Sequence, residues 1–269
     1  MKEISSTSNP YIKKIIAWQE KSKLRKADNV FVIDGWKETK MALENGFVVE
    51  TILCSASIMH SSTFSDLESS LKQLQSKAEI IRVSDAVFDK ISIRGNTSKV
   101  VAIAQQKTHL LSQITLSKNP IILVIDAVEK PGNLGAILRI ADAGNIDAVL
   151  CCDVATDVYN PNIIRSSVGC VFTQKIAVAD KNSIYDFLKE NNISIYTTSL
   201  KVAKNYLEID FKKPSAFVLG TEAIGVDEFW ETHSTQNIII PMRGQNDSLN
   251  VSNTAAIVLF EALRQRTIV

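Results

Sequence analysis

Hydrophobic positions in the first part of the chain follow two alternating periods. Tyr11, Ile15 and Trp18 stand at i, i+4 and i+7 and predict an amphipathic helix of about four turns, capped by Asn9. Short runs rich in β-branched residues then alternate with helical segments between residues 29 and 105. This alternation predicts βαβ units and a small, mostly parallel sheet.

The second half repeats the alternation with more deeply apolar strands. Residues 121–128 (IILVIDAV) are typical of a strand that is covered on both faces. Five further strand candidates follow, and a long helix over about 251–266 is predicted after them. The pattern predicts an α/β protein of two domains with a linker between them. We expect domain, linker and domain at 1–106, 107–119 and 120–269.

Composition narrows the class of protein. The chain has 269 residues, 45% hydrophobic and 22% charged, as in ordinary globular proteins. Its net charge of +1 excludes a uniformly basic nucleic-acid coat, but residues 1–26 carry seven basic against two acidic residues. A solvated helix face is an alternative explanation of that basic segment. No apolar run approaches the roughly 18 residues of a membrane span, and no secretory signal is visible.

The cysteines add a prediction about the compartment. Four cysteines without CxxC spacing are too few for a disulfide framework in a chain of this length. We expect them to be small buried residues in a reducing compartment, the cytoplasm. We also expect no metal site, because His60, His109 and His233 form no cluster with ligand spacing.

Three loops that follow predicted strands carry the candidate chemistry, because ligands of parallel sheets bind at the carboxyl ends of the strands. The first, at 129–144, combines a Pro-Gly turn, Asn133 and a lone Arg139 among small apolar residues. One guanidinium in that setting suits a phosphate or a carboxylate. The spacing matches neither a dinucleotide fingerprint nor a P-loop. A structural turn with an exposed arginine explains this loop equally well.

The other two loops are also ambiguous when taken singly. The second places Glu222 between Gly220 and Gly225, on a tight turn. The third follows an apolar strand that ends at Pro241 and opens the last helix with 248–250 (Ser-Leu-Asn). Helix caps at Thr221 or Glu222, and at Ser248 or Asn250, are the alternatives.

In this order and spacing, the three loops resemble the signature motifs of the SpoU/TrmH branch of the SPOUT RNA methyltransferases, over about residues 120–266. Residues 29–46 are similar to the N-terminal substrate-binding module of that family, an L30e-like α/β domain. The resemblance implies a C-terminal α/β domain with a parallel sheet and a trefoil knot, and a homodimer through that domain. It implies methyl transfer from S-adenosylmethionine to a ribose 2′-hydroxyl of structured RNA, with ribosomal RNA favoured over transfer RNA and without a membrane partner.

The same resemblance assigns residues to roles. It places the catalytic residues at Asn133, Arg139, Glu222, Ser248 and Asn250. It places the methyl-donor site, built largely from backbone groups, at Thr198, Gly220, Ile240, Met242, Leu249 and Asn250. For RNA contacts, the basic N-terminal segment and a family-like Arg-Ser pair indicate Lys13, Lys14, Lys21, Lys23, Arg25, Lys26 and Arg165. Contact with a second subunit or a surface salt bridge is the alternative for Arg165.

None of the assigned catalytic residues is a His, Lys or Cys that could serve as an ordinary base. Arginine is effectively always protonated, so we expect Arg139 to clamp a phosphate and stabilise the developing alkoxide. The proton would leave to that phosphate or to water. Two other classes remain to be distinguished: an RNA-binding protein that has lost turnover, and a nicotinamide oxidoreductase, which the missing dinucleotide fingerprint disfavours.

Overall fold

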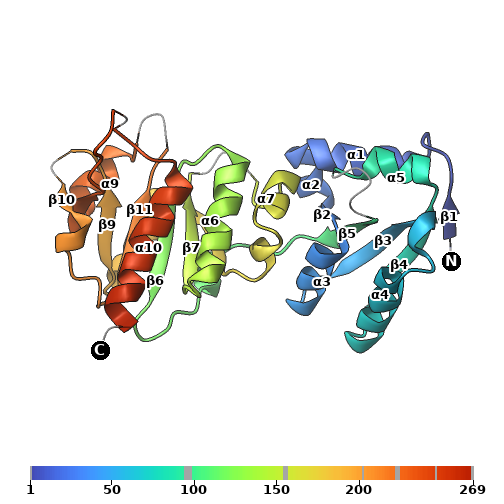
Figure 1. The fold of residues 1–269 in the computed structure, drawn as a ribbon, viewed down its shortest axis with the longest axis horizontal. Helices are drawn as coiled ribbons and strands as arrows, with labels where there is room; N and C mark the ends of the chain where they lie inside the picture. The colour runs from blue at the N-terminus through green and yellow to red at the C-terminus, as the bar shows by residue number, and fades with distance from the viewer. Residues whose placement is uncertain are drawn as a thin grey trace. The chain divides into compact units, whose positions relative to one another are not determined.

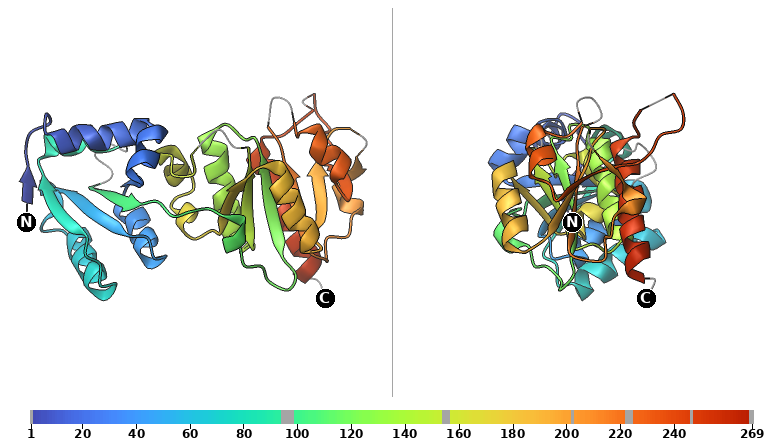
Figure 2. Two further views of the ribbon diagram at one scale, coloured as in Figure 1. Left: turned by 180° about the vertical axis from the view of Figure 1, so that it is seen from behind. Right: turned by 90° about the vertical axis from the view of Figure 1, so that its left-hand side faces the viewer.

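The computed structural model describes residues 2–93, 99–153, 157–201, 203–221, 225–245 and 247–267. The chain forms two compact units (Figures 1 and 2). Unit 1 comprises Met1–Thr108 and Asp157–Thr173, and unit 2 comprises His109–Thr156 and Gln174–Val269. Unit 1 therefore includes a short segment from the second half of the sequence. Among the described residues, no helix combines the length and the apolar content that crossing a bilayer requires.

Unit 1 contains a mixed five-stranded sheet in the order β1-β4-β3-β5-β2. Its strands are β1 (Lys2–Ile4), β2 (Val30–Asp34), β3 (Val49–Ser55), β4 (Glu79–Val83) and β5 (Val100–Gln105). Strand β4 pairs in parallel with β1 and β3, whereas β5 is antiparallel to β2 and β3. The expectation of a mostly parallel sheet is therefore wrong for this unit. Alternation of strands and helices shows that helices separate the strands, but not in which direction each strand returns.

The N-terminal helix of unit 1 is shorter in the structure than the sequence predicts, and a second helix follows it. The helices of this unit are α1 (Pro10–Glu20), α2 (Ser22–Asp28), α3 (Trp36–Glu44), α4 (Ser62–Gln73), α5 (Asp85–Ile91) and α7 (Pro161–Ser166). Asn9 caps α1 as predicted, accepting the Tyr11 N–H at 2.8 Å, and Ile12, Ile15 and Trp18 form its buried face. The helix ends because Lys21 is extended, with φ −117° and ψ 106°, and α2 starts one residue later.

The segment 157–173 is fixed to unit 1 by polar and aromatic contacts. Arg25 Nε donates to Asp157 Oδ2 at 2.7 Å, and both side chains are buried. The ring of Tyr159 stacks on Phe31 with centroids 4.4 Å apart. One of the predicted strands has the sequence FTQKIAV, residues 172–178; in the structure a strand starts there only at Ile176, and Phe172 packs within unit 1 against Phe31.

Unit 2 contains a seven-stranded sheet in the order β10-β12-β9-β11-β6-β7-β8. The strands are β6 (Ile121–Asp126), β7 (Ala148–Cys152), β8 (Ile176–Ala179), β9 (Ser194–Thr198), β10 (Lys204–Asn205), β11 (Ser215–Leu219) and β12 (Gln236–Ile239). Every pairing among them is parallel, which confirms the predicted parallel sheet. The central strands β6, β7 and β11 are buried along their whole length, as their apolar sequences predict.

Helices cover both faces of this sheet. They are α6 (Pro131–Ala143), α8 (Lys181–Glu190), α9 (Glu228–His233) and α10 (Val251–Thr267). Helices α6 and α10 lie side by side on one face, and α8 and α9 lie on the other (Figures 1 and 2). A Cβ atom at Gly144, the C-cap of α6, would lie 2.8 Å from Leu259 Cδ2 of α10, so the two helices pack closely there. All four cysteines of the protein are free and buried, as predicted.

Candidate active site

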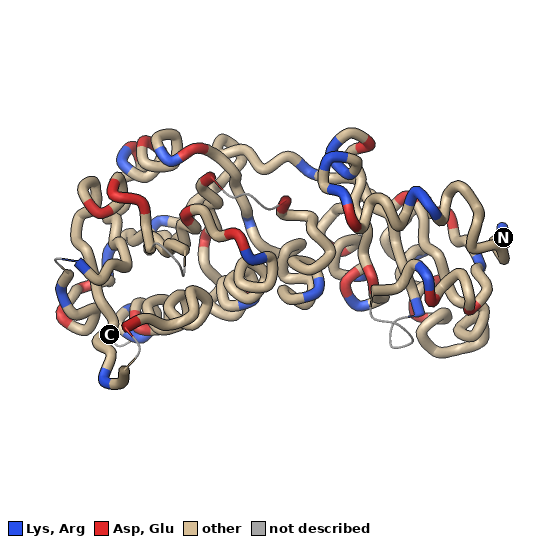
Figure 3. The backbone as a smooth tube through the Cα atoms, turned by 90° about the horizontal axis from the view of Figure 1, so that it is seen from above, with Lys and Arg blue, Asp and Glu red and all other residues tan. Residues whose placement is uncertain are grey.

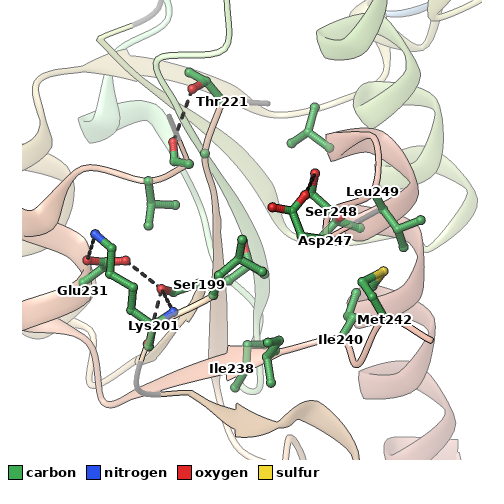
Figure 4. Close-up of a pocket in the computed structure, with 18 residues that line it drawn as sticks. Ser199, Lys201, Thr221, Glu231, Ile238, Ile240, Met242, Asp247, Ser248 and Leu249 are labelled. Carbon is green, nitrogen blue, oxygen red and sulfur yellow. Dashed lines mark hydrogen bonds and ion pairs between the residues drawn. The ribbon is translucent and has the colours of Figure 1, made fainter. Parts of the chain in front are cut away.

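A cavity of about 480 Å³ lies at the carboxyl-terminal edge of the unit 2 sheet (Figure 4). We call it the strand-end cavity. Its lining comes from the ends of β9, β11 and β12, from Glu231 of α9, and from the loop before α10 and the first turn of that helix. These residues are Thr198, Ser199, Leu200, Lys201, Gly220, Thr221, Gly225, Val226, Glu231, Ile238, Ile239, Ile240, Met242, Asp247, Ser248, Leu249, Val251 and Thr254.

The predicted donor-binding residues converge on this cavity. It is lined by five of the six, namely Thr198, Gly220, Ile240, Met242 and Leu249. The predicted catalytic residue Ser248 also lines it. Two of the three loops that the sequence singles out, the second from residue 218 onward and the third from residue 238 onward, therefore meet at one site. The described lining does not include the sixth predicted residue, Asn250, although both of its chain neighbours line the cavity.

Backbone packing explains the glycines of the second loop. Thr221 and Gly225 exchange two backbone hydrogen bonds, of 2.8 and 3.0 Å, and Gly225 has φ +75°. A Cβ atom at Gly220 would lie 2.2 Å from the Gly225 carbonyl oxygen, well inside van der Waals contact. Only glycine at position 220 allows this turn to close beside the cavity. The predicted catalytic Glu222 falls between these residues and lies outside the part of the chain that the structure describes.

Asn250 connects the first and third loops. Its Nδ2 donates to Asn133 Oδ1 at 3.2 Å, and its Oδ1 accepts from the Ser252 N–H at 3.0 Å and from Ser252 Oγ at 2.6 Å. Asn250 is thus the cap of α10, as one alternative held, and also a partner of a predicted catalytic residue. Asn133 is not a cap, because α6 already begins at Pro131.

Arg139 lies on α6, six residues after Asn133, and is exposed. Within the described chain it forms no hydrogen bond or ion pair, and it does not line the strand-end cavity. Its guanidinium therefore has all of its donors available for an incoming group. The structure brings Asn133 to Asn250 and Ser248 to the cavity, but no contact joins Arg139 to either.

A buried carboxylate links β6, the first strand of unit 2, to the residue that ends the second loop. Asp126 ends β6, is only 4% exposed, and accepts the Asp227 N–H through Oδ2 at 2.9 Å. Burial raises the pKa of Asp126, and the backbone N–H of Asp227 opposes that rise. Asp227 in turn caps α9 and pairs with Lys181 at 2.7 Å, which lowers the pKa of Asp227.

The predicted RNA-contacting residues all belong to unit 1, but they differ in exposure. The exposed ones are Lys13, Lys14, Lys21, Lys23, Lys26 and Arg165. Lys14 lies 3.2 Å from Asp28, and Arg165 donates to Asn162 at 3.0 Å. Arg25 is 1% exposed and is held by Asp157 and by the carbonyl oxygen of Trp18, so it is not available to RNA. The sequence predicts one continuous helix through this segment, but α2 begins a new helix after Lys21, and Arg25 is the buried residue of that helix.

Charge divides between the two units. Unit 1 contains 17 basic and 13 acidic residues, a net charge of +4, whereas unit 2 contains 13 basic and 16 acidic residues, a net charge of −3. Acidic positions interrupt the basic ones along both units (Figure 3). The near-neutral total is therefore the sum of one basic unit and one acidic unit.

Sequence reasoning missed a polar group in the strand-end cavity, formed by Ser199, Lys201 and Glu231. Ser199 directly follows β9, so the rule that ligands bind at strand ends could have identified it. Glu231 lies on the short helix α9, nine residues after Glu222, and no motif in the sequence distinguishes it.

An all-parallel α/β unit with a cavity of this size at its strand ends is typical of proteins that bind a small molecule there, and this chain also contains a separate basic α/β unit. Residues 120–260 match the SpoU rRNA Methylase family, and residues 9–102 match the MRM3-like substrate binding domain. The chain belongs to the SpoU rRNA methylase family and carries the N-terminal substrate-binding domain that its sequence predicts.

The similarity to known relatives and to solved structures covers nearly the whole chain. The 23S rRNA (guanosine(2553)-2′-O)-methyltransferase RlmP of Bacillus subtilis is 30% identical over 262 residues, covering 97% of this chain and 98% of its own. A crystal structure of an RNA 2′-O ribose methyltransferase is 34% identical, with a TM-score of 0.84, and covers 99% and 100% of the two chains. The AdoMet-bound rRNA methyltransferase of Sinorhizobium meliloti is 28% identical, with a TM-score of 0.89 and coverage of 98% and 97%.

Proposed function

We propose that this protein transfers a methyl group from S-adenosylmethionine to a ribose 2′-hydroxyl of ribosomal RNA. One observation carries the proposal: five of the six residues expected to hold the methyl donor, together with Ser248, line a single cavity. Membership of the SpoU rRNA methylase family and near-full-length similarity to 23S rRNA 2′-O-methyltransferases support it.

The residues of the strand-end cavity fit the donor. Its volume lies in the range of about 300–1,000 Å³ that is common for small-ligand sites. Ile240, Met242 and Leu249 supply an apolar surface for the adenine ring, and Gly220 exposes backbone where a Cβ would block the turn. S-adenosylmethionine, when bound, supplies a methyl group already activated by a sulfonium. The protein therefore mainly has to align the acceptor and assist loss of a proton.

The residues of the first and third loops suit that task. We propose that Asn133, fixed by Asn250, and Ser248 at the cavity wall orient the ribose hydroxyl toward the donor. Exposed Arg139 would clamp the neighbouring phosphate through a bidentate contact and stabilise the alkoxide as it forms. The proton would leave to that phosphate or to water. Glu222 would hold the second loop and orient Asn133.

Substituting Arg139 by lysine tests the clamp. Lysine keeps the charge but cannot form the bidentate contact, so Arg139→Lys is expected to lower methyl transfer by roughly 10²-fold with unchanged folding. Retained activity with a shifted pH optimum would contradict the clamp. Arg264→Lys on α10 is the matched control, because Arg264 pairs with Glu261 at 2.7 Å and stands outside the site.

We propose that unit 1 binds the RNA through its exposed basic residues. These are Lys13, Lys14, Lys21, Lys23 and Lys26 of the N-terminal helices and Arg165 of the segment that joins them in unit 1. Phosphate contacts of this kind give affinity without sequence specificity. We omit Arg25 from the set because it is buried.

The resemblance also leads us to propose a trefoil knot and a homodimer in unit 2. The knot is supported by the path of the chain, which reaches β12 beyond β9 and then returns across the sheet to set α10 against α6 and β11. The dimer rests on the resemblance, and Phe260, which is 48% exposed on α10, offers a position at which to test it. Phe260→Glu is expected to shift a dimer to a monomer in light scattering; a wild-type monomer at micromolar concentration would contradict the dimer. Free buried cysteines and an rRNA substrate agree with a cytoplasmic location.

The test of function is transfer of a tritiated methyl group to total RNA from a strain that lacks the protein, followed by mapping of 2′-O-methyl positions. We expect label at one ribose of ribosomal RNA, and none with Arg139→Ala. Label in transfer RNA alone would overturn the substrate assignment. Binding of S-adenosylmethionine without transfer to any RNA would favour the non-catalytic RNA-binding alternative.

A further inference from the structure

The strand-end cavity has a polar end that no motif predicts. Ser199 Oγ donates to Glu231 Oε1 at 2.6 Å and accepts the Lys201 N–H at 3.0 Å. Lys201 Nζ lies 3.5 Å from Glu231 Oε2. Figure 4 shows these side chains on the opposite side of the lining from Asp247, Ser248 and Leu249. We call Ser199, Lys201 and Glu231 the polar trio.

The Glu231 carboxylate is held in place without being saturated. Its side chain is 15% exposed, whereas that of Lys201 is 79% exposed. A carboxylate has about four lone-pair sites, and the trio uses one of them in a short hydrogen bond and another in a longer ion pair. Because Ser199 is buried, it fixes the orientation of the carboxylate at the cavity wall. Glu231 therefore presents unused acceptor sites at the wall of a cavity lined by both apolar and polar residues.

We propose that Glu231 binds the vicinal ribose hydroxyls of the methyl donor, an inference that rests on the proposed function. Two adjacent hydroxyls match the two oxygens of a carboxylate, and dinucleotide-binding enzymes use the same pairing. Lys201 balances the charge of Glu231, so the trio is neutral overall. A neutral diol fits that environment, whereas the donor's α-ammonium group would meet the Lys201 cation.

Binding of three nucleosides by titration calorimetry tests the assignment: S-adenosylhomocysteine, 5′-methylthioadenosine, which lacks the amino-acid group, and 2′,3′-dideoxy-S-adenosylhomocysteine. Glu231→Gln is expected to weaken the first two by about tenfold or more, because a hydrogen bond to a charged acceptor is lost. The dideoxy compound is expected to bind wild type and variant within a factor of about two. Gln keeps an oxygen for Ser199, and melting curves verify folding.

Glu228→Gln is the matched control, since Glu228 starts the same helix but does not line the cavity, and it is expected to bind all three nucleosides as wild type does. A Glu231→Gln penalty that vanishes with 5′-methylthioadenosine would assign Glu231 to the amino-acid end and overturn the proposal. An equal penalty on the dideoxy compound would also overturn it. If the wild-type protein binds none of the nucleosides, the donor assignment itself fails, and the proposed function fails with it.

Discussion

The side-chain amide of Asn250 donates to the side-chain oxygen of Asn133 at 3.2 Å, across 117 positions of sequence. The same amide caps α10 through its oxygen, which accepts from the Ser252 N–H. One residue therefore sets the start of α10 and positions a side chain at the start of α6. Both helices begin at the carboxyl-terminal edge of the sheet, where the cavity lies.

Two substitutions of Asn250 separate its two roles. Asn250→Ser keeps a side-chain oxygen that can cap α10 but is too short to reach Asn133, so we expect nearly unchanged stability and reduced methyl transfer. Asn250→Ala removes both and is expected to cost about 0.5–2 kcal/mol of unfolding free energy as well. Chemical denaturation and methyl-transfer rates measure the two effects. Full activity of Asn250→Ser would show that the link to Asn133 is dispensable.

The turn beside the cavity gives a second prediction. Gly220→Ala puts a Cβ atom where the Gly225 carbonyl oxygen lies 2.2 Å away, so the Thr221–Gly225 turn has to open. We expect a loss of S-adenosylhomocysteine binding of at least about tenfold by calorimetry, since this turn forms a wall of the cavity. Gly132→Ala is the control, because a Cβ there meets nothing within 4 Å. Equal binding by the two variants would mean that the turn has no part in holding the donor.

The predicted donor-site residues came from the resemblance of the three loops to a known family, and five of the six line one cavity. Each of Gly220, Ile240 and Leu249 stands directly after a strand or just before a helix, so its position follows from elements that the sequence predicts well. Glu231 could not be predicted in this way. It lines the cavity only because the fold brings α9 to the end of β9, where the Ser199 hydroxyl donates to the Glu231 carboxylate, a juxtaposition that depends on tertiary structure.

The same limit explains the failures in unit 1. Arg25 looks like its exposed neighbours in sequence, and its burial depends on Asp157, a partner 132 positions away. The direction of β5 likewise depends on how the chain returns to the sheet after the short helix α5. The spacing of hydrophobic residues predicts a strand there but not its direction. Charge counts predict a basic segment, but only the fold decides which of its charges remain in water.

Arg25 and Lys23 each carry one positive charge, but removing that charge is expected to affect stability at Arg25 and RNA binding at Lys23. Arg25→Ala leaves the Asp157 carboxylate buried without its partner, and we expect a loss of about 3–5 kcal/mol of unfolding free energy. Lys23→Ala removes an exposed charge and is expected to leave stability unchanged, while weakening RNA binding and reducing its salt dependence. Denaturant titrations and binding at several salt concentrations distinguish the two. A stable Arg25→Ala with weakened RNA binding would return Arg25 to the RNA-contacting set.

Asp126 gives a prediction about pH. Its carboxylate is buried, and burial raises its pKa from the usual 3.8. Between the unfolded and native values the native state binds more protons, so the contribution of Asp126 to stability falls as pH rises through that interval. Asp126→Asn removes the titration but keeps an oxygen to accept the Asp227 N–H. We therefore expect the melting temperature of Asp126→Asn, relative to wild type, to rise between about pH 3.5 and pH 7.

Asp227→Asn is the matched control because its titration has the opposite sign. Lys181 and the Phe229 N–H lower the pKa of Asp227, so its ionised form stabilises the native state above the unfolded pKa, and that contribution is lost as the pH falls. The melting temperature of Asp227→Asn, relative to wild type, is therefore expected to fall over the same pH range, while asparagine still caps α9. Parallel trends for the two variants would mean that burial of Asp126 does not oppose its ionisation, and that the link from β6 to α9 is held equally well by a charged or a neutral acceptor.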